Sequence, residues 1–327
     1  MLRYSITLFF YNFMNPIISD YVTRQIKLKA MELGFIHVGI AKAVKLEKEA
    51  RYLEKWLSNG FQGDMSYMNN HFDKRIDPAL LVPGAKSVIS LAYNYYTTLK
   101  QSDCAAPKIS MYAYGRDYHK VVKKKLLSLF RFIREISGEI NGRVFVDSAP
   151  VMERDWAKKA GIAWSGKNTL SIHPRMGSYF FLGEIIVDME LVYDAPIKDY
   201  CGTCRKCIDA CPTGAIDEKG YVLDGKRCIS YLTIELKNEI PSEFHEKMEG
   251  WMFGCDICQQ VCPWNRFSVP HAEQDFIPKP ALLEMTKSDW TDLKEDFFNN
   301  LFHGSAVKRT GFEGLKRNIS IVSKKNN

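Results

Sequence analysis

Eight of the nine cysteines in this 327-residue sequence lie in one short segment between residues 201 and 262. The first group of four is Cys201, Cys204, Cys207 and Cys211. A proline follows the fourth cysteine, which gives the C-x2-C-x2-C-x3-C-P spacing of bacterial ferredoxins. In that arrangement three thiolates bind one 4Fe–4S cluster and the fourth binds the neighbouring cluster. The spacing predicts a small domain organised by iron–sulfur clusters.

The second group, Cys255, Cys258 and Cys262, lacks the first cysteine of a full motif, and Cys228 is the only other cysteine nearby. The cross-over pattern then predicts two ligand sets. The first set is Cys201, Cys204, Cys207 and Cys262, and the second is Cys211, Cys228, Cys255 and Cys258. Two zinc sites would also use eight ligands, but the C-x2-C-x2-C run is tighter than usual zinc spacing, so we favour two 4Fe–4S clusters.

Composition narrows the class of protein but does not identify the reaction. Hydrophobic residues make up 46% and charged residues 25%, which excludes a disordered or fibrous chain. The net charge of +7 permits a polyanionic partner such as nucleic acid without requiring one. Thiolate ligands imply a reducing compartment, and no apolar run reaches about 18 residues, so we expect a cytoplasmic protein without a membrane span. The apolar residues 1–14 are either a signal peptide or upstream of a true start at Met14.

The rest of the chain mixes helices and strands. Apolar periodicity predicts strands over 35–40, 86–96, 143–147 and 179–187 and helices over 19–34, 46–57, 118–136, 152–160 and 228–236. We therefore expect an α+β (α/β-like) first domain followed by a ferredoxin-like domain. The predicted boundaries are an N-terminal extension (1–18), a catalytic domain (19–197), the cluster domain (198–267) and a basic C-terminal extension (268–327).

Four segments of the first domain concentrate Gly, Asn, Ser and aromatic residues in apparent loops. They are 114–119 (YGRDYH), 146–154 (VDSAPVMER), 160–170 (AGIAWSGKNTL) and 177–184 (GSYFFLGE). Loops of this kind suit a large ligand that needs close approach to the backbone, but tight structural turns explain them equally well.

Together with the doubled cysteine motif, these segments resemble the epoxyqueuosine reductase family over about residues 19–270, and the basic segment 308–318 (KRTGFEGLKRN) resembles it too. The resemblance implies a nitroreductase-related domain that binds cobalamin, reduced through two 4Fe–4S clusters. It also implies an oxidoreductase that converts epoxyqueuosine to queuosine at the wobble position of tRNAs with GUN anticodons, with loss of the epoxide oxygen as water.

The resemblance also assigns residues. Asp147 matches the family's proton donor, and an acid beside a bulky apolar cofactor is expected to have a raised pKa. Helix N-cap is the alternative role for Asp147. The positions that match cobalamin contacts are Arg75, Ser110, Asp147, Ser171, Leu182, Ile185 and Ser230. A surface salt bridge would equally explain Arg75, and a buried strand would explain Leu182 and Ile185.

The expected partners are a tRNA anticodon stem-loop and a reduced electron donor of the flavodoxin or ferredoxin type, with the enzyme a monomer. Phosphate contacts are expected from Arg205, Lys206, Lys226, Arg227 and the basic residues of the C-terminal segment. The competing hypotheses are a cobalamin- and cluster-dependent reductive dehalogenase acting on small organohalides and a non-catalytic electron-transfer module. Such dehalogenases usually carry a twin-arginine signal, which this sequence does not show. An electron-transfer module would leave Asp147 without a role.

Overall fold

A computed structural model describes residues 16–324 of the chain. Most of the predicted N-terminal extension, including the proposed signal peptide or alternative start, lies outside these residues. Within the described range no helix is both long and apolar enough to cross a membrane.

A four-stranded sheet forms the centre of the first half of the molecule. Its strands, in spatial order, are β1 (His37–Lys42), β2 (Ser87–Asn94), β7 (Phe180–Val187) and β4 (Gly142–Phe145). Every neighbouring pair is antiparallel. The antiparallel pairing agrees with the α+β prediction and not with its α/β-like qualification, which would need parallel strands joined by crossover helices.

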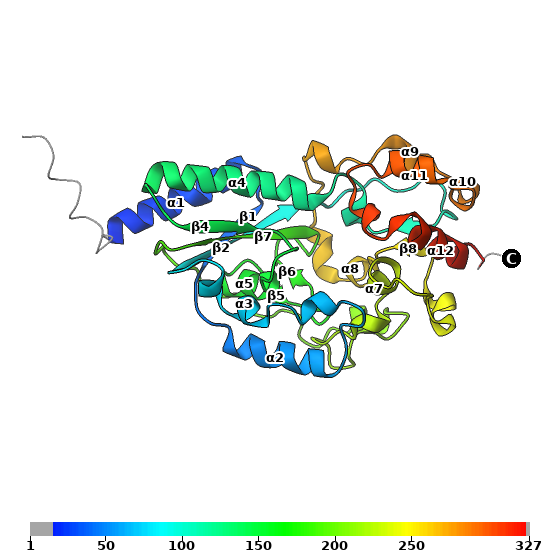
Figure 1. Ribbon diagram of the computed structural model, residues 1–327, viewed down its shortest axis with the longest axis horizontal. Coiled ribbons are helices and arrows are strands. Elements are labelled where there is room, and N and C mark those ends of the chain that lie inside the picture. The colour runs from blue at the N-terminus through cyan, green and yellow to red at the C-terminus, as the bar shows by residue number, and fades with distance from the viewer. Residues whose placement is uncertain (1–15, 325–327) are drawn as a thin grey trace, which may run out of the picture.

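Helices cover both faces of this sheet (Figure 1). On one face lie α1 (Pro16–Glu32) and α4 (Tyr118–Ser137). The helix α5 (Glu153–Lys159) packs against the other face, with α2 (Glu47–Ser58) and α3 (Phe72–Ile76) beyond it. The apolar side chains of α4 recur every three to four residues, and five of them are buried against the sheet: Val121, Val122, Leu126, Leu129 and Ile133.

The predicted strands and helices of the first half are confirmed, with boundaries shifted by one to three residues. The largest difference is at the first helix, expected from residue 19, which begins at Pro16. Sequence reasoning also missed the short elements α3, β3 (Lys108–Ile109), β5 (Trp164–Ser165) and β6 (Ser171–Ile172), which are too short to show a period.

The second half carries the eight clustered cysteines and the C-terminal residues. Its elements up to residue 260 are α6 (Lys206–Asp209), α7 (Ile229–Ile234), β8 (Trp251–Phe253) and α8 (Ile257–Gln260). The C-terminal residues form four further helices, namely α9 (Pro280–Glu284), α10 (Lys287–Thr291), α11 (Glu295–Leu301) and α12 (Gly311–Ser323). These last helices were not predicted.

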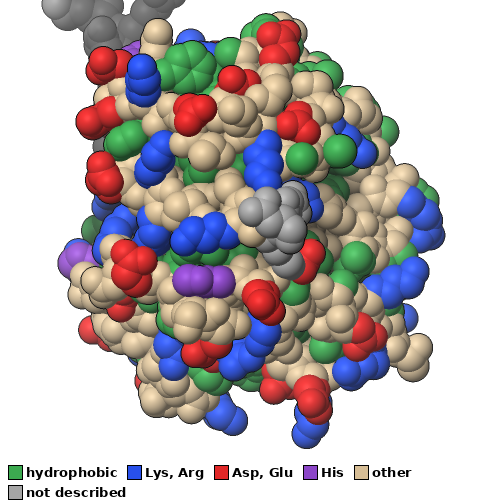
Figure 2. All heavy atoms as spheres, turned by 90° about the vertical axis from the view of Figure 1, so that its right-hand side faces the viewer, with side chains coloured by type: hydrophobic (Ala, Val, Ile, Leu, Met, Phe, Trp, Pro, Cys, Tyr) green, Lys and Arg blue, Asp and Glu red, His purple; other side chains and the backbone are tan. Residues whose placement is uncertain are grey.

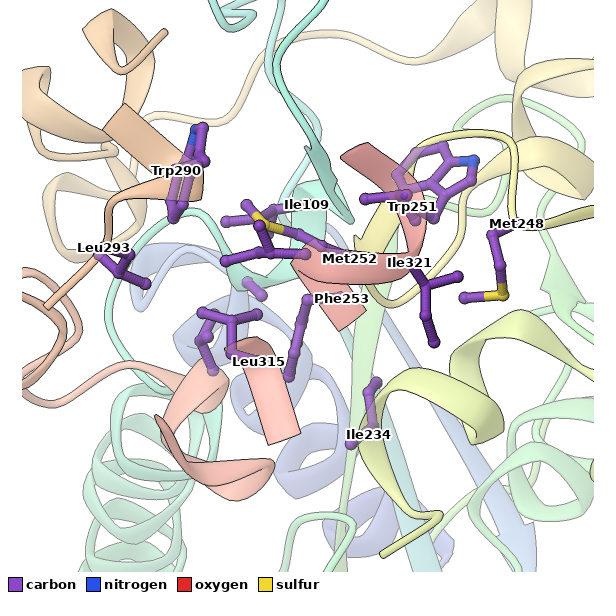
Figure 3. Packing of buried hydrophobic residues seen from close by; sticks show 14 of the residues in the cluster. Ile109, Ile234, Met248, Trp251, Met252, Phe253, Trp290, Leu293, Leu315 and Ile321 are labelled. Carbon is purple, nitrogen blue, oxygen red and sulfur yellow. The ribbon is translucent and has the colours of Figure 1, made fainter. Parts of the chain in front are cut away.

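One hydrophobic core unites these two groups of elements (Figure 3). Trp251 and Phe253 of β8 pack with Trp290 of α10 and with Leu315 and Ile321 of α12. Residues 268–324 therefore pack onto the half that carries the clustered cysteines. Their basic side chains lie on the exposed faces of helices whose opposite faces are buried. The strand β3 of the first half also pairs in parallel with β8, which joins the two halves through backbone hydrogen bonds.

Candidate functional site

The Asp147 carboxylate lies two residues after the end of β4, on the loop that leads to α5. Tyr118 donates its hydroxyl proton to Oδ2 of Asp147, and Nε2 of His119 lies 3.1 Å from the same oxygen. The N-cap of α5 is Met152, without a capping side chain, so the alternative role of Asp147 as a helix cap is wrong. Asp147 instead faces the first turn of α4, where the YGRDYH segment supplies both of its partners.

His119 lies between two carboxylates. Its Nδ1 is 2.7 Å from Oδ1 of Asp117, and its Nε2 faces Asp147. Burial lowers the pKa of His119, but the hydrogen bonds and charges of the two carboxylates outweigh it and raise the pKa to about 9. The imidazole is therefore protonated at neutral pH and donates from both ring nitrogens.

The expected raised pKa of Asp147 is not found. Burial does raise it, but the hydrogen bonds from His119 and Tyr118 and the charges of His119 and Arg309 outweigh burial, so the pKa of Asp147 lies below its ordinary value. The sequence showed the apolar surroundings but not the two donors. The proton of this site consequently resides on His119, with Asp147 as its ionised partner.

Arg309 brings the C-terminal segment to this site. It lies in the 3-10 helix Ala306–Arg309 and forms a two-point ion pair with Glu235, at 2.7 and 2.9 Å. Its guanidinium lies 5.8 Å from the ring centroid of Tyr67, and its charge acts on Asp147. The side chain of Asp147 is 55% exposed, so its carboxylate is open to solvent at the place where Arg309 of the C-terminal segment comes near it. Sequence reasoning grouped Arg309 with phosphate-binding residues, because only the tertiary fold places it here.

The cysteine thiols fall into two groups by their mutual electrostatic effects. Burial and then the neighbouring thiols of Cys201, Cys262 and Cys204 raise the pKa of Cys207 to about 11. In the other group, burial and then the thiols of Cys228, Cys255, Cys207 and Cys211 raise the pKa of Cys258. Apart from that single link through Cys207, the neighbours follow the two ligand sets expected from the spacing. The assignment of each set to one 4Fe–4S cluster stays a prediction from spacing.

The AGIAWSGKNTL segment holds the cysteine loops. Trp164 Nε1 donates to the Cys201 sulfur at 3.4 Å. Lys167 Nζ donates to the carbonyls of Gly202 and Cys204, at 2.6 and 2.9 Å. These contacts assign part of the Gly- and Asn-rich sequence to joining the two halves of the protein.

The GSYFFLGE segment holds the second cysteine loop in the same way. Gln259 Nε2 donates to the Ser178 carbonyl at 3.0 Å, and Ser178 N donates to Oδ1 of Asn265 at 2.6 Å. Gly177 has a φ of +71°, and a Cβ there would lie 2.1 Å from Asn265 Oδ1. Only glycine fits at this contact.

The remaining candidate cobalamin contacts differ in what they could offer. Arg75 donates to the Tyr67 carbonyl at 2.8 Å, and its buried Nε has no partner among the described residues. No carboxylate pairs with it in that range, so the surface salt bridge is not seen. A free donor of this kind fits a polar ligand group. Ser230 donates to the Cys228 thiol through its backbone and hydroxyl, which places it beside a cluster ligand.

At the four other positions the side chains are buried or half-buried within the protein. Ser110 donates its hydroxyl to the buried carboxylate of Asp256, and Ser171 is a buried residue of β6 paired with Ser165. Ile185 is 0% exposed and lies in the core of the sheet, so its side chain cannot contact a cofactor, and the buried-strand reading is the correct one. Leu182 is half-buried opposite Ala92.

Several basic residues expected to bind phosphate are hydrogen-bonded within the protein. Arg227 donates to the Thr213 carbonyl at 2.7 Å, and Arg317 donates to the carbonyls of Leu232 and Leu236. Lys206 and Lys226 are exposed. Figure 2 shows the end of the molecule that carries the C-terminal helices, where basic and acidic side chains are interspersed. A phosphate contact there would involve single side chains and not a continuous basic patch.

Comparisons with known proteins agree with the resemblance. Residues 75–148 match the family described as "Epoxyqueuosine reductase QueG, DUF1730", and residues 200–265 match a 4Fe-4S double cluster binding domain. The epoxyqueuosine reductase of Cellulophaga algicola is 57% identical over 297 residues, covering 91% of this chain and 96% of its own. The Escherichia coli K12 protein of that name is 41% identical over 319 residues, covering 94% and 82%.

Solved structures show the same fold. An epoxyqueuosine reductase bound to an epoxyqueuosine-modified tRNA-Tyr stem loop superimposes with a TM-score of 0.84 at 30% identity, over 93% of this chain and 81% of that one. The Bacillus subtilis enzyme, with its catalytic aspartate loop swung out of the active site, gives a TM-score of 0.82 at 28% identity, over 94% and 82%. A reductive dehalogenase described as B12-dependent gives 0.51 at 16% identity, over 82% and 34%, a likeness of fold alone.

Proposed function

The chain belongs to the epoxyqueuosine reductase family, and on that premise we propose that it reduces epoxyqueuosine to queuosine in the anticodon loop of tRNA. The observation that carries the proposal is the pairing of a carboxylate and a protonated imidazole, Asp147 and His119, in a chain that also carries a double-cluster domain. A reductase needs an electron supply and a proton source at one place, and this arrangement provides a candidate for each.

We propose Cys201, Cys204, Cys207 and Cys262 as the ligands of one 4Fe–4S cluster and Cys211, Cys228, Cys255 and Cys258 as those of the other. When bound, such clusters supply single electrons from an external donor, here expected to be a flavodoxin or ferredoxin. The raised thiol pKa values of this region are those of the metal-free protein, since bound iron keeps thiols ionised. Hydrogen bonds from Trp164 and Ser230 would stabilise the negative sulfurs of Cys201 and Cys228.

We propose that cobalamin binds beside the exposed carboxylate of Asp147, where it would supply the strong reductant that opens the epoxide. Arg75, with its unpartnered Nε, and the half-buried Leu182 are the side chains best placed to hold it. Ser110, Ser171 and Ser230 would contribute through backbone groups, because their side chains are buried or already hydrogen-bonded.

The protein's own contribution is the proton. Removal of the epoxide oxygen as water consumes two electrons and two protons and leaves a carbon–carbon double bond. His119 holds a proton at Nε2, 3.1 Å from Asp147 Oδ2. His119 passes its proton to Asp147, and Asp147 delivers it to the epoxide oxygen, so Asp147 is the catalytic acid; the second proton comes from solvent. Asp117 and Tyr118 keep this pair oriented.

We retain the proposed division into a catalytic domain (19–197) and a cluster domain (198–267), with one refinement. The shared core of β8 and α12 supports counting residues 268–324 with the cluster domain. A tRNA stem-loop would approach Asp147 between the catalytic domain and the cluster domain, near the Arg309–Glu235 ion pair. The enzyme is proposed to act as a monomer in the cytoplasm.

Nucleoside mass spectrometry tests the proposal. Anaerobically purified, iron-reconstituted protein is incubated with cobalamin, a reductant and tRNA that contains epoxyqueuosine. We expect queuosine to form, and to be lost on omission of cobalamin or in Asp147→Asn. Asp296→Asn, a change at an exposed aspartate of α11, is the matched control and should retain activity. Absence of conversion by protein with a full iron content would refute the assignment.

A further inference from the structure

Two glutamates, the half-buried Glu153 and the fully buried Glu184, lie behind the Asp147 loop, and neither takes part in the steps above. Asp147 has a φ of +51°, in the left-handed region that a non-glycine residue rarely adopts. Its backbone N–H donates to the Glu153 carboxylate, from the first turn of α5. Glu153 therefore holds the backbone of Asp147, and the position of that backbone sets the direction of the Asp147 carboxylate.

Glu153 is in turn backed by Glu184, which is 0% exposed in the middle of the sheet. Glu184 Oε1 accepts from Ser90 Oγ at 3.0 Å across the β2–β7 pair. Its other oxygen, Oε2, is buried and has no donor among the described residues, and the Glu153 carboxyl lies within hydrogen-bonding reach of the Glu184 carboxyl. Two carboxylates cannot hydrogen-bond to each other unless they share a proton, because ionised carboxylates only accept.

The titration of both groups is consistent with that shared proton. Burial, followed by repulsion from Glu153, raises the pKa of Glu184 well above its ordinary value. Burial, followed by repulsion from Asp147, raises the pKa of Glu153 to about 8. The charged or polar groups that face the pair are Asp147, His119, Tyr118 and Ser90.

We propose that Glu153 and Glu184, joined by one shared proton, are positioning residues that hold the Asp147 loop in its inward conformation. Ser90 fixes Glu184 on the sheet, Glu184 fixes Glu153 on α5, and Glu153 holds the backbone of Asp147. The acid is thereby anchored to the rigid sheet and not merely to its own loop. The proposal rests on the proposed function for its catalytic meaning, but the anchoring itself can be observed without turnover.

The test compares Glu153→Gln with Glu153→Met. The glutamine carbonyl can still accept from the Asp147 N–H, and its amide can donate to Glu184, whereas methionine of similar size does neither. Hydrogen–deuterium exchange of residues 146–152 is measured first. We expect Glu153→Gln to exchange within about threefold of the unaltered chain and Glu153→Met to exchange roughly 10- to 100-fold faster, the loss expected for a hydrogen bond to a charged group.

Single-turnover kinetics supply the second readout. We expect Glu153→Met to lower kcat by roughly 10-fold or more with little change in KM, and Glu153→Gln to retain most of the rate. Equal exchange in the two variants would overturn the proposal, as would a Glu153→Gln variant as defective as Glu153→Met. An unaltered chain without activity would refute the proposed function but leave the exchange comparison intact.

If Glu153→Met does not fold, a second variant tests the same proposal. Ser90→Ala removes the hydroxyl that holds Glu184 and alters little volume in the sheet. We expect faster exchange in residues 146–152 there too, by a smaller factor, because Glu184 keeps its contact with Glu153. Exchange unchanged from the unaltered chain would overturn the proposal by this route.

Discussion

Replacement of His119 by alanine tests whether the proton of the site resides on the imidazole. His119 supplies one of two hydrogen bonds to the Asp147 carboxylate, and Tyr118 supplies the other. A hydrogen bond to a charged group contributes about 1.5–3 kcal/mol, so its loss raises the pKa of Asp147. The hydrogen bond from Tyr118 and the charge of Arg309 remain in the variant and still favour the ionised form of Asp147.

The two chains should then differ in their pH–rate profiles. In the unaltered chain the proton is retained until the pH rises through about 9, the pKa of His119. In His119→Ala the proton must come from Asp147 alone, whose pKa lacks the support of a protonated partner. We expect the single-turnover rate at pH 7.5 to fall roughly 10- to 100-fold, the equivalent of the lost hydrogen bond to a charged group, and the alkaline limb to move to lower pH.

The assay is queuosine formation under single-turnover conditions with excess enzyme, between pH 5 and pH 10, with His303→Ala as the control at an exposed histidine. A rate at pH 7.5 within about threefold of the unaltered chain would refute the assignment of the proton to His119. So would an alkaline limb that stays near pH 9. The same linkage predicts a stability effect: the charge of His119 stabilises the fold fully below pH 6.5, and this contribution is lost as the pH rises through about 9.

Three further predictions concern the cluster-bearing half. Cys228→Ser should reduce the reconstituted iron content from about eight to about four atoms per chain, whereas Cys104→Ser, at an exposed cysteine outside both sets, should leave it unchanged. Asn318→Ala removes donors to the buried carbonyls of Thr233 and Met252, and denaturant unfolding should show a loss of about 2 kcal/mol that Asn299→Ala does not. Gly177→Ala places a methyl group against Asn265 at a left-handed residue, and should lower the midpoint of thermal unfolding by the equivalent of at least about 1 kcal/mol; an unchanged midpoint would contradict the close contact.

The sequence predicted most of what depends on local pattern. The four strands of the sheet and the helix α4 have clear apolar periods. The two cysteine ligand sets stay a prediction from spacing. The titration of Asp147 could not be predicted, because His119 and Tyr118 reach it from a segment 28 and 29 residues away. The helices α9 to α12 were missed for a different reason. Each of the first three has at most seven residues, too few to display a helical period, and the basic side chains of the C-terminal segment drew attention to its exposed face.

The shared core of β8 and α12 has a consequence for biosynthesis. Ile321 completes the packing around Trp251, but it follows the last cluster cysteine, Cys262, by 59 residues. At roughly 5–20 residues per second, a ribosome needs about 3–12 seconds to add this segment. All eight thiols therefore leave the ribosome before the core that supports them can close. Cluster insertion into the finished fold must wait for the end of translation, and oxygen has that interval in which to oxidise the free thiols of the nascent chain.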